Sequence, residues 1–232
     1  MRQWGQWIWS SCGLRLVWRC CVVGLLLCSL PVMIFFRGLR PLFMRCQVCV
    51  FFTQWLRSPA QVGAVFPSSV FLAQKIARVA HAADCSGYIL ELGAGLGAVT
   101  AQLLESGIPS ERLIVLERSP LMVGQLRSRF PNLTVIEGDA ACLSECLKGY
   151  LGPVDLVVSS LPLRSLSGVV RESIFSELEL VLPEQGTFIQ YTYALSASRS
   201  LYPATFECCS SSVVWRNVPP AKVECFSVRR VL

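Results

Sequence analysis

Short apolar runs alternate with helical segments from residue 88 onward, and this alternation restricts the possible folds more than any other feature of the sequence. Runs of strand type lie at 88–92, 113–117, 133–137, 154–159 and 187–193. Between the first three lie a helical segment at 98–106 and another that begins with a Ser119-Pro120 cap and ends at Arg129. Such alternation predicts an α/β fold with an open, mostly parallel sheet and ligand sites at the carboxyl ends of its strands.

Two further segments complete the predicted domain. Pro67-Ser68-Ser69 is a cap signal for a helix in which Leu72, Ile76 and Val79 share one face. Residues 204–231 predict two terminal strands around a proline-containing turn. We therefore expect seven strands with helices on both faces of the sheet.

Glycines and acidic residues gather where the predicted strands end. The first strand runs into Glu91-Leu92-Gly93-Ala94-Gly95-Leu96-Gly97, in which the glycines let the backbone approach a ligand and turn into a helix N-terminus. Glu117 ends the second strand, 22 positions after Gly95, where a carboxylate can bind both hydroxyls of a ribose. Asp139 and Ala140 follow the third strand, where they would bond an adenine amino group beside an apolar contact.

The pattern Gly93-x-Gly95-x-x-Ala98 alone would also suit a dinucleotide dehydrogenase. Two details favour S-adenosylmethionine: an acid two residues before the first glycine, which can meet the ammonium of the cofactor directly or through water, and a second acid after the third strand. The alternative is that these acids only cap loops. The residues predicted to hold the cofactor are Glu91, Gly93, Ala94, Gly95, Glu117, Asp139, Ala140 and Ser160.

Charge divides the chain into two parts. Nine basic and no acidic residues lie between Met1 and Ala83, whereas 12 basic and 15 acidic residues follow from Asp84, so a segment of charge +9 precedes a domain of charge −3. An enzyme that acts on nucleic acid more usually carries its basic patch on the catalytic body. The asymmetry favours a basic, apolar anchor on a mildly acidic domain.

The anchor is predicted over residues 1–57 and the catalytic domain over 58–232. Cys20 to Phe36 is an uncharged run of 17 residues, which spans about 26 Å as a helix. Flanking residues extend it to a transmembrane helix over 18–39, with a re-entrant or interfacial helix as the alternative. Residues 43–56 predict an interfacial helix, or one packed on the core of the domain. We expect a membrane-associated protein with its catalytic domain on the cytoplasmic side.

Twelve cysteines suggest metal or redox chemistry, but their positions do not support it. Cys46 and Cys49 form the single CxxC pair, and His81 is the sole histidine. Too few ligands are therefore available for a four-ligand zinc site, and we expect buried free thiols in a reducing compartment, with no metal.

The glycine and acid positions resemble those of class I methyltransferases, which have a Rossmann-like seven-stranded sheet. Four segments are similar to bacterial phospholipid N-methyltransferases, and the similarity extends from Trp55 to Leu232. It implies methyl transfer from S-adenosylmethionine to the amine of phosphatidylethanolamine, in up to three rounds ending at phosphatidylcholine. A phospholipid substrate and a membrane are then the expected partners, with no nucleic acid and no evident protein partner. The segments are 55–69, 161–163, Gln190-Tyr191-Thr192-Tyr193 and 216–221.

The related rRNA adenine dimethyltransferases are the main alternative. Their fourth-strand loop reads Asn-Leu-Pro-Tyr or Phe, whereas residues 160–163 here read Ser-Leu-Pro-Leu, which lacks the aromatic ring that stacks on a flipped base. A membrane-bound protein of this fold that binds a ligand without catalysis is a third possibility. Ser160, Tyr191 and Tyr193 are the candidates to orient the amine, although the tyrosines suit the core equally well; Arg164 is either a contact for the lipid phosphate or a solvated side chain.

Overall fold

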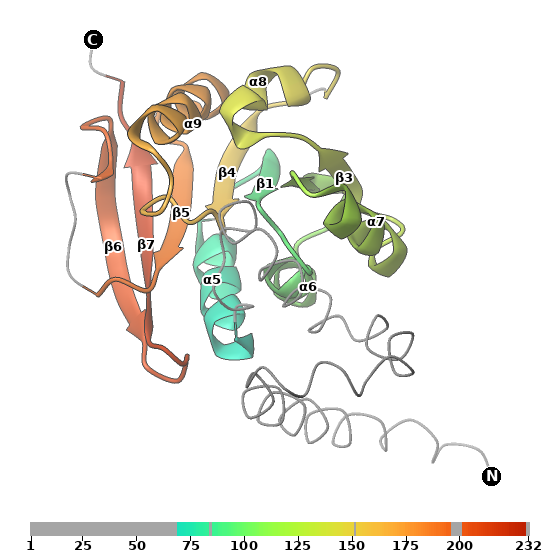
Figure 1. Cartoon of the computed structure of the whole chain (residues 1–232), viewed down its shortest axis with the longest axis horizontal. Coiled ribbons are helices and arrows are strands. Elements are labelled where there is room, and N and C mark those ends of the chain that lie inside the picture. Colours follow the sequence, from blue (N-terminus) through green and yellow to red (C-terminus); the bar gives the residue numbers. More distant parts are fainter. Residues whose placement is uncertain (1–68, 84, 151, 196–200, 231–232) are drawn as a thin grey trace, which may run out of the picture. The chain divides into compact units, whose positions relative to one another are not determined.

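A computed structural model describes residues 69–83, 85–150, 152–195 and 201–230. These residues form an α/β domain whose sheet is flanked by helices (Figure 1). Two short 3₁₀ helices, η2 (Ser110–Arg112) and η3 (Ala140–Cys142), lie in connections. The other elements are α5 (Val70–Ala82), β1 (Tyr88–Leu92), α6 (Ala98–Glu105), β2 (Leu113–Glu117), α7 (Pro120–Arg129), β3 (Thr134–Glu137), α8 (Leu143–Cys146), β4 (Val154–Ser159), α9 (Gly168–Val181), β5 (Thr187–Thr192), β6 (Phe206–Val214) and β7 (Ala221–Val228).

The seven strands form one sheet in the order β3-β2-β1-β4-β5-β7-β6. The first five are parallel, and β7 runs antiparallel to both β5 and β6. The chain reverses its direction of travel across the sheet between β1 and β4, which makes the carboxyl ends of these two strands the expected ligand crevice. The predicted mostly parallel, seven-stranded sheet is confirmed.

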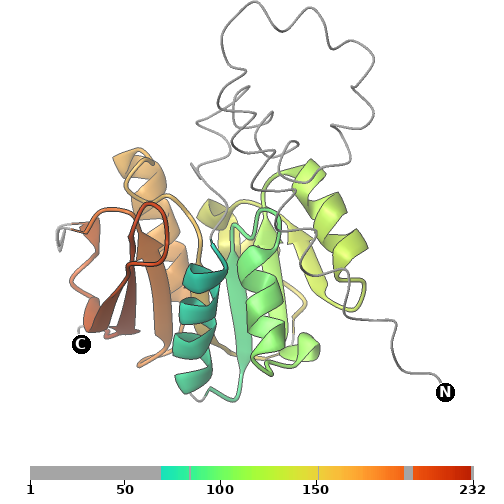
Figure 2. The same cartoon turned by 90° about the horizontal axis from the view of Figure 1, so that it is seen from below.

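Helices cover both faces of the sheet. One buried cluster joins α5, α6 and α7 to one face, and includes Leu72, Ile76 and Leu103. The other cluster joins α8 and α9 to the opposite face, and includes Phe175 and Phe188. Figure 2 shows α5 and α6 side by side on their face. Strands buried on both sides read as continuous apolar runs, which is why 113–117 and 154–159 could be recognised from sequence.

Local signals placed most element ends correctly. The hydroxyl oxygen of Ser69 accepts a hydrogen bond from the backbone N–H of Leu72 at 3.3 Å and caps α5, as its sequence predicts. The bounds of β1, β2, α7 and β4 agree with the expected ranges.

Helix α9 is not among the elements predicted from the sequence. Its N-terminus is capped by Ser167, whose hydroxyl oxygen accepts from the N–H of Val170 at 3.4 Å. Only Ile174, Phe175 and Leu178 of this helix are buried, whereas Val169 and Leu180 are exposed. Glu172 and Ser176 occupy other exposed positions, so the helix does carry an apolar face at helical spacing, which was not recognised in the sequence.

The predicted anchor, including the transmembrane helix over 18–39 and the interfacial helix over 43–56, lies outside the described residues. Within the described ranges, the search for a helix long and apolar enough to cross a membrane finds none.

Candidate functional site

The loop after β1 approaches the loop after β4 closely and leaves open space beside itself. Gly93 and Gly95 both have positive φ angles, of 71° and 57°. A Cβ added at Gly93 would lie 2.8 Å from Cδ2 of Leu161, whereas one at Gly95 would meet no atom of the described residues within 4 Å. The backbone conformation therefore favours glycine at both positions, but only Gly95 faces room that a ligand can fill.

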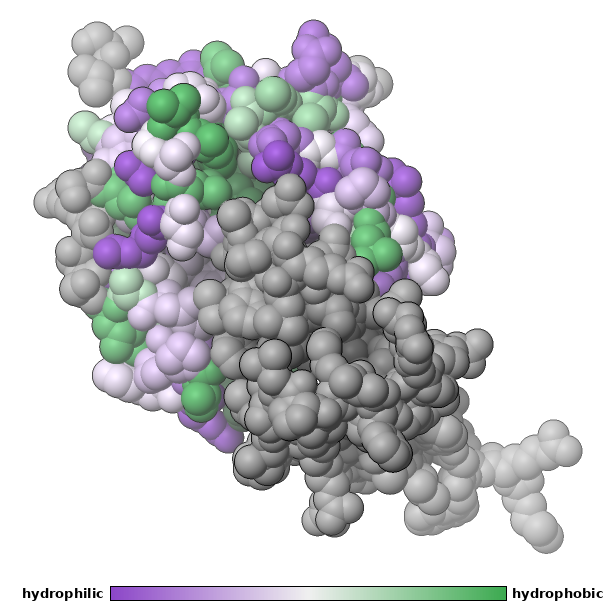
Figure 3. Space-filling model, viewed as in Figure 1, coloured by the Kyte–Doolittle hydropathy of each residue, from purple (hydrophilic) through white to green (hydrophobic). Residues whose placement is uncertain are grey.

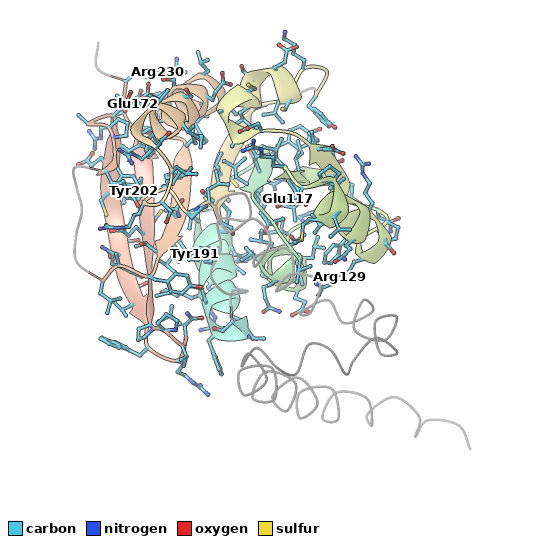
Figure 4. The ribbon with its side chains drawn as sticks, viewed as in Figure 1. Glu117, Arg129, Glu172, Tyr191, Tyr202 and Arg230 are labelled. Carbon is cyan, nitrogen blue, oxygen red and sulfur yellow. The ribbon has the colours of Figure 1, made fainter. Side chains whose placement is uncertain are left out.

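Glu117 is fixed at the end of β2, between β1 and β3 (Figure 4). Its Oε2 accepts a hydrogen bond from the N–H of Gly95 at 2.9 Å, and its Oε1 accepts from the N–H of Ser119 at 2.9 Å. Each carboxylate oxygen keeps a second lone pair, so the group can still accept from two hydroxyls. This is the arrangement that binding of a ribose requires.

Glu91 is the most perturbed acid of the site. Its side chain is fully buried, and its Oε2 accepts from the hydroxyl of Thr100 at 2.6 Å. Its Oε1 is buried with no hydrogen-bond partner among the described residues. Burial raises the pKa of Glu91 to about 7; the charge of Glu117 adds to this rise, and the Thr100 hydrogen bond opposes it. A buried carboxylate with an unused oxygen is suited to a cationic ligand group.

Asp139 and Ala140 follow β3, one strand beyond Glu117 in the sheet. Asp139 Oδ1 accepts from the N–H of Ala141 at 3.0 Å, and Oδ2 lies 3.5 Å from Nε of Arg118. Ala140 is buried against the α8 side of the sheet. Asp139 is partly exposed and remains able to accept from an amino group, beside the apolar surface that was predicted.

These residues fit S-adenosylmethionine on structural grounds. The unpartnered oxygen of Glu91 suits the ammonium, Glu117 suits the ribose hydroxyls, and Asp139 suits the adenine amino group, in the order of successive strand ends. The space beside Gly95 lets the ligand pass close to the backbone. Among the residues described, no cluster of three His, Cys, Asp or Glu side chains could hold a metal ion.

Ser160 lies where the loop after β4 meets β1. Its N–H donates to the carbonyl oxygen of Leu92 at 2.9 Å. Its hydroxyl oxygen is buried and has no hydrogen-bond partner within the described part of the chain. Leu163, which stands where the rRNA enzymes carry an aromatic residue, is only 2% exposed and packs in the core on the α9 side. The loop thus offers one free hydroxyl in apolar surroundings.

Gln190 holds this loop in place, a role that sequence reasoning did not assign to it. Its Nε2 donates to the carbonyl oxygen of Leu161 at 3.0 Å and to that of Tyr191 at 2.7 Å. Gln190 is 2% exposed, on the face opposite Tyr191. The available signal was a polar residue inside an otherwise apolar strand, since a buried amide needs partners.

The two predicted tyrosines differ in their surroundings. Tyr191 is buried in the cluster that joins α5 to the sheet (Figure 4), and its ring meets that of Tyr193 edge to face at 6.0 Å. Tyr193 is only partly buried, and burial raises the pKa of its hydroxyl to about 12, with Tyr191 adding to the rise and Asn217 opposing it. Tyr191 therefore has a packing role, Tyr193 stays a candidate for the acceptor side, and Arg164 is exposed.

Known proteins support the same conclusion. A methyltransferase-domain profile matches residues 89–186. The chain is 31% identical to an ornithine lipid N-methyltransferase of Singulisphaera acidiphila over 176 residues, 74% of this chain and 91% of that protein. It is 28% identical to a probable ribosomal RNA small subunit methyltransferase A of Methanospirillum hungatei, over 66% of this chain and 56% of that protein. The N-methyltransferase NodS of Bradyrhizobium japonicum, solved with S-adenosyl-L-homocysteine, shares the fold at a TM-score of 0.58 and 14% identity, over 78% of this chain and 99% of NodS.

The chain belongs to the class I S-adenosylmethionine-dependent methyltransferases. Within that class it is similar to bacterial lipid N-methyltransferases, and it is an N-methyltransferase with S-adenosylmethionine as its cofactor. The expected family, N-methyltransferase activity and cofactor are confirmed, whereas phosphatidylethanolamine as the substrate stays a prediction.

Proposed function

We propose that this protein N-methylates the primary amine of phosphatidylethanolamine at a membrane surface, in steps leading toward phosphatidylcholine. The observation that carries the proposal is the loop after β4, where the buried hydroxyl of Ser160 is the one unpartnered side-chain oxygen of residues 160–163 and Leu163 is turned into the core. Such a loop suits a small amine better than a stacked purine, because it has no aromatic ring.

S-adenosylmethionine supplies a methyl group on a sulfonium, and transfer moves that methyl to nitrogen while the sulfur keeps the electron pair of the broken bond. The protein must therefore place a neutral amine in line with the methyl group. A lipid ammonium has a pKa of about 10, like that of Lys, so roughly one head group in a thousand is neutral at pH 7. Desolvation beside Leu161 and Pro162 favours that neutral form.

In this proposal Ser160 accepts a hydrogen bond from the amine and fixes its direction. Gln190 positions Ser160 indirectly, through the Leu161 carbonyl. Tyr193 is the second polar candidate near the acceptor, because its hydroxyl oxygen is buried with no hydrogen-bond partner among the described residues. The proton released from the amine leaves to solvent.

Attachment to the membrane is part of the proposal. Residues 1–57 would act as the anchor, with the catalytic domain on the cytoplasmic side, and the support is the basic, tryptophan-rich composition of that segment. Carbonate extraction of membranes that contain the full chain tests this part: retention in the membrane fraction is expected, and release to the soluble fraction would contradict it.

Ornithine lipid is a second candidate substrate, favoured by the 31% identity to an enzyme that bears its name. It also presents a primary amine, and the free carboxylate of its ornithine takes the place of the lipid phosphate as the anionic group. Arg164 could meet either anion, so the two candidates are separated by chromatography of the labelled lipid.

The direct test offers labelled S-adenosylmethionine together with vesicles that contain phosphatidylethanolamine, ornithine lipid and phosphatidylcholine, and with small-subunit rRNA. The expected result is label in the chloroform phase, on phosphatidylethanolamine after chromatography. Label on ornithine lipid selects the second candidate. Label in RNA alone would place the chain with the rRNA enzymes, and no transfer would favour binding without catalysis.

A further inference from the structure

Exposed hydrophobic side chains collect at one edge of the domain. Ten large hydrophobic side chains of the described residues are exposed. Eight of them lie at the edge of the sheet where the parallel strands end, as the order of the elements along the chain shows. They lie in the first turns of α5, α7 and α9, just after β5, or in the turn between β6 and β7. The eight are Val70, Phe71, Leu121, Val169, Val170, Leu195, Trp215 and Val218; the other two are Tyr150 and Leu180.

Four of these side chains form a hairpin patch, which consists of Val70, Phe71, Trp215 and Val218. Trp215 and Val218 are 70% and 85% exposed, values that water normally discourages for side chains of this size. In Figure 3, hydrophobic residues lie among weakly polar ones at the lower left, over the tip of the β6–β7 hairpin.

The hairpin patch is held together by specific contacts between segments that lie far apart in the sequence. Asn217 is buried; its Oδ1 accepts from the N–H of Ser69 at 3.3 Å, and its Nδ2 donates to the carbonyl oxygen of Pro219 at 2.6 Å. The guanidinium of Arg216 stacks 4.0 Å from the ring centroid of Phe71. The turn is thus fastened to the start of α5, and its apolar side chains point outward from a fixed base.

The charge around the hairpin patch is one-sided. Residues 69–83 and 208–221 contain Lys75, Arg78 and Arg216 and no acidic residue. Exposed tryptophan beside arginine is typical of surfaces that enter the headgroup layer, and uncompensated cations near an anionic leaflet each contribute attraction. A soluble protein partner would give no reason for the apolar side chains to follow the same edge as the cofactor residues.

We propose that the carboxyl edge of this domain docks on anionic bilayers through the hairpin patch, with Trp215 and Val218 inserted at the headgroup level and Arg216 against lipid phosphate. This contact belongs to the folded domain and is separate from the anchor predicted in residues 1–57. The orientation turns the loops that carry Gly95 and Ser160 toward the lipid. The inference rests on the proposed function, since a lipid substrate gives this edge its reason to face a membrane, but its test requires no methyl transfer.

The test is hydrogen exchange of the full chain, with and without vesicles of phosphatidylcholine and phosphatidylglycerol. The backbone amides of residues 69–73 and 213–220 should exchange about tenfold more slowly when the lipid concentration is roughly nine times the Kd of the protein for the vesicles. Peptides around Leu180, at the opposite edge, should not change. Equal exchange of 213–220 with and without vesicles would overturn the proposal, including the case in which another part of the chain already covers the patch.

Variants give a second measurement. Arg216→Gln should raise the lipid concentration that gives half-maximal protection of residues 69–73 by about fivefold, as expected for the loss of one cation at an anionic surface. The double variant Trp215→Ser, Val218→Ser should raise the same lipid concentration by about tenfold or more. Leu180→Ser is the matched control, because it removes an equally exposed apolar side chain from the far edge.

The outcomes for docking and for catalysis can be told apart. Vesicle-dependent protection without methylation of any lipid supports the docking surface and contradicts the proposed substrate. Lipid methylation at full rate by the Trp215→Ser, Val218→Ser variant, with no vesicle-dependent protection in the unmodified chain, supports the substrate and contradicts the docking surface.

Discussion

Replacement of Glu91 by Gln should stabilise this protein at alkaline pH while it removes affinity for the cofactor. Glu91 is fully buried, its Oε1 has no partner in the described region, and its ionised form is disfavoured chiefly by burial. Gln has nearly the same shape and remains neutral at all pH values. Its amide oxygen can still accept the hydrogen bond of Thr100, so the variant imitates the protonated native residue.

The size of the effect follows from the pKa. A rise from 4.5 to about 7 corresponds to about 3 kcal/mol, at roughly 1.4 kcal/mol per pH unit. Between these pH values the folded protein holds a proton that the unfolded chain has lost. The stability that comes from this group is therefore full below pH 4.5 and is lost as the pH rises through 7.

Urea unfolding of the full chain without cofactor, at pH 5 and pH 8, measures this difference. Glu91→Gln should match the unmodified protein within about 1 kcal/mol at pH 5 and exceed it by about 3 kcal/mol at pH 8. Glu172→Gln, which changes an exposed glutamate on α9 (Figure 4), is the matched control and should alter neither value.

The same variant tests the role of Glu91 in binding. If its carboxylate meets the ammonium of S-adenosylmethionine, Glu91→Gln should weaken binding by about 3 kcal/mol, the cost of leaving one partner of a buried charge pair alone. Calorimetry at pH 7 should also show proton release on binding by the unmodified protein, and less by the variant. A pH-independent difference in stability, or unchanged cofactor affinity, would refute the reasoning.

Three further changes test the rest of the site. Gly95→Asp should destabilise the fold by only about 1 kcal/mol, because its Cβ meets no atom of the described residues and Asp tolerates a positive φ. The new side chain should nevertheless abolish cofactor binding, which calorimetry measures. Ser160→Ala should lower kcat about tenfold or more, with little change in the cofactor Kd. It should cost no stability, because the hydroxyl has no partner to lose among the described residues. An unchanged kcat would exclude the proposed role of Ser160. Gln190→Leu should lower kcat, because it removes the hydrogen bond to the Leu161 carbonyl, and should cost about 1–3 kcal/mol of stability. If stability falls but turnover is unchanged, Gln190 has a structural role only.

The fold was predictable because its signals are local. The strands 113–117 and 154–159 are continuous apolar runs, and Ser69 and Pro120 mark helix starts by chemistry that needs no tertiary context. Helix α9 was missed although its buried residues Ile174, Phe175 and Leu178 share one face. The exposed Val169 and Leu180 interrupt the alternation of apolar and polar faces, but Glu172 and Ser176 on the exposed side preserve it.

The proximity of the candidate cofactor residues was predictable because strand order fixes it. Glu91, Glu117 and Asp139 each stand at or just beyond the end of a strand, and parallel neighbours bring these ends together. The contacts of Gln190 and Asn217 were not predictable. Each bonds to a segment distant in the sequence, so their roles depend on how loops close in three dimensions.

Lipid methylation can be tested directly by mass spectrometry of the lipids of a host that lacks methylated lipids, with and without this gene. We expect one to three added methyl groups on phosphatidylethanolamine, found with the full chain and absent with Gly95→Asp expressed at the same level. Unmodified lipids in cells that contain the full chain at that level would contradict the claim.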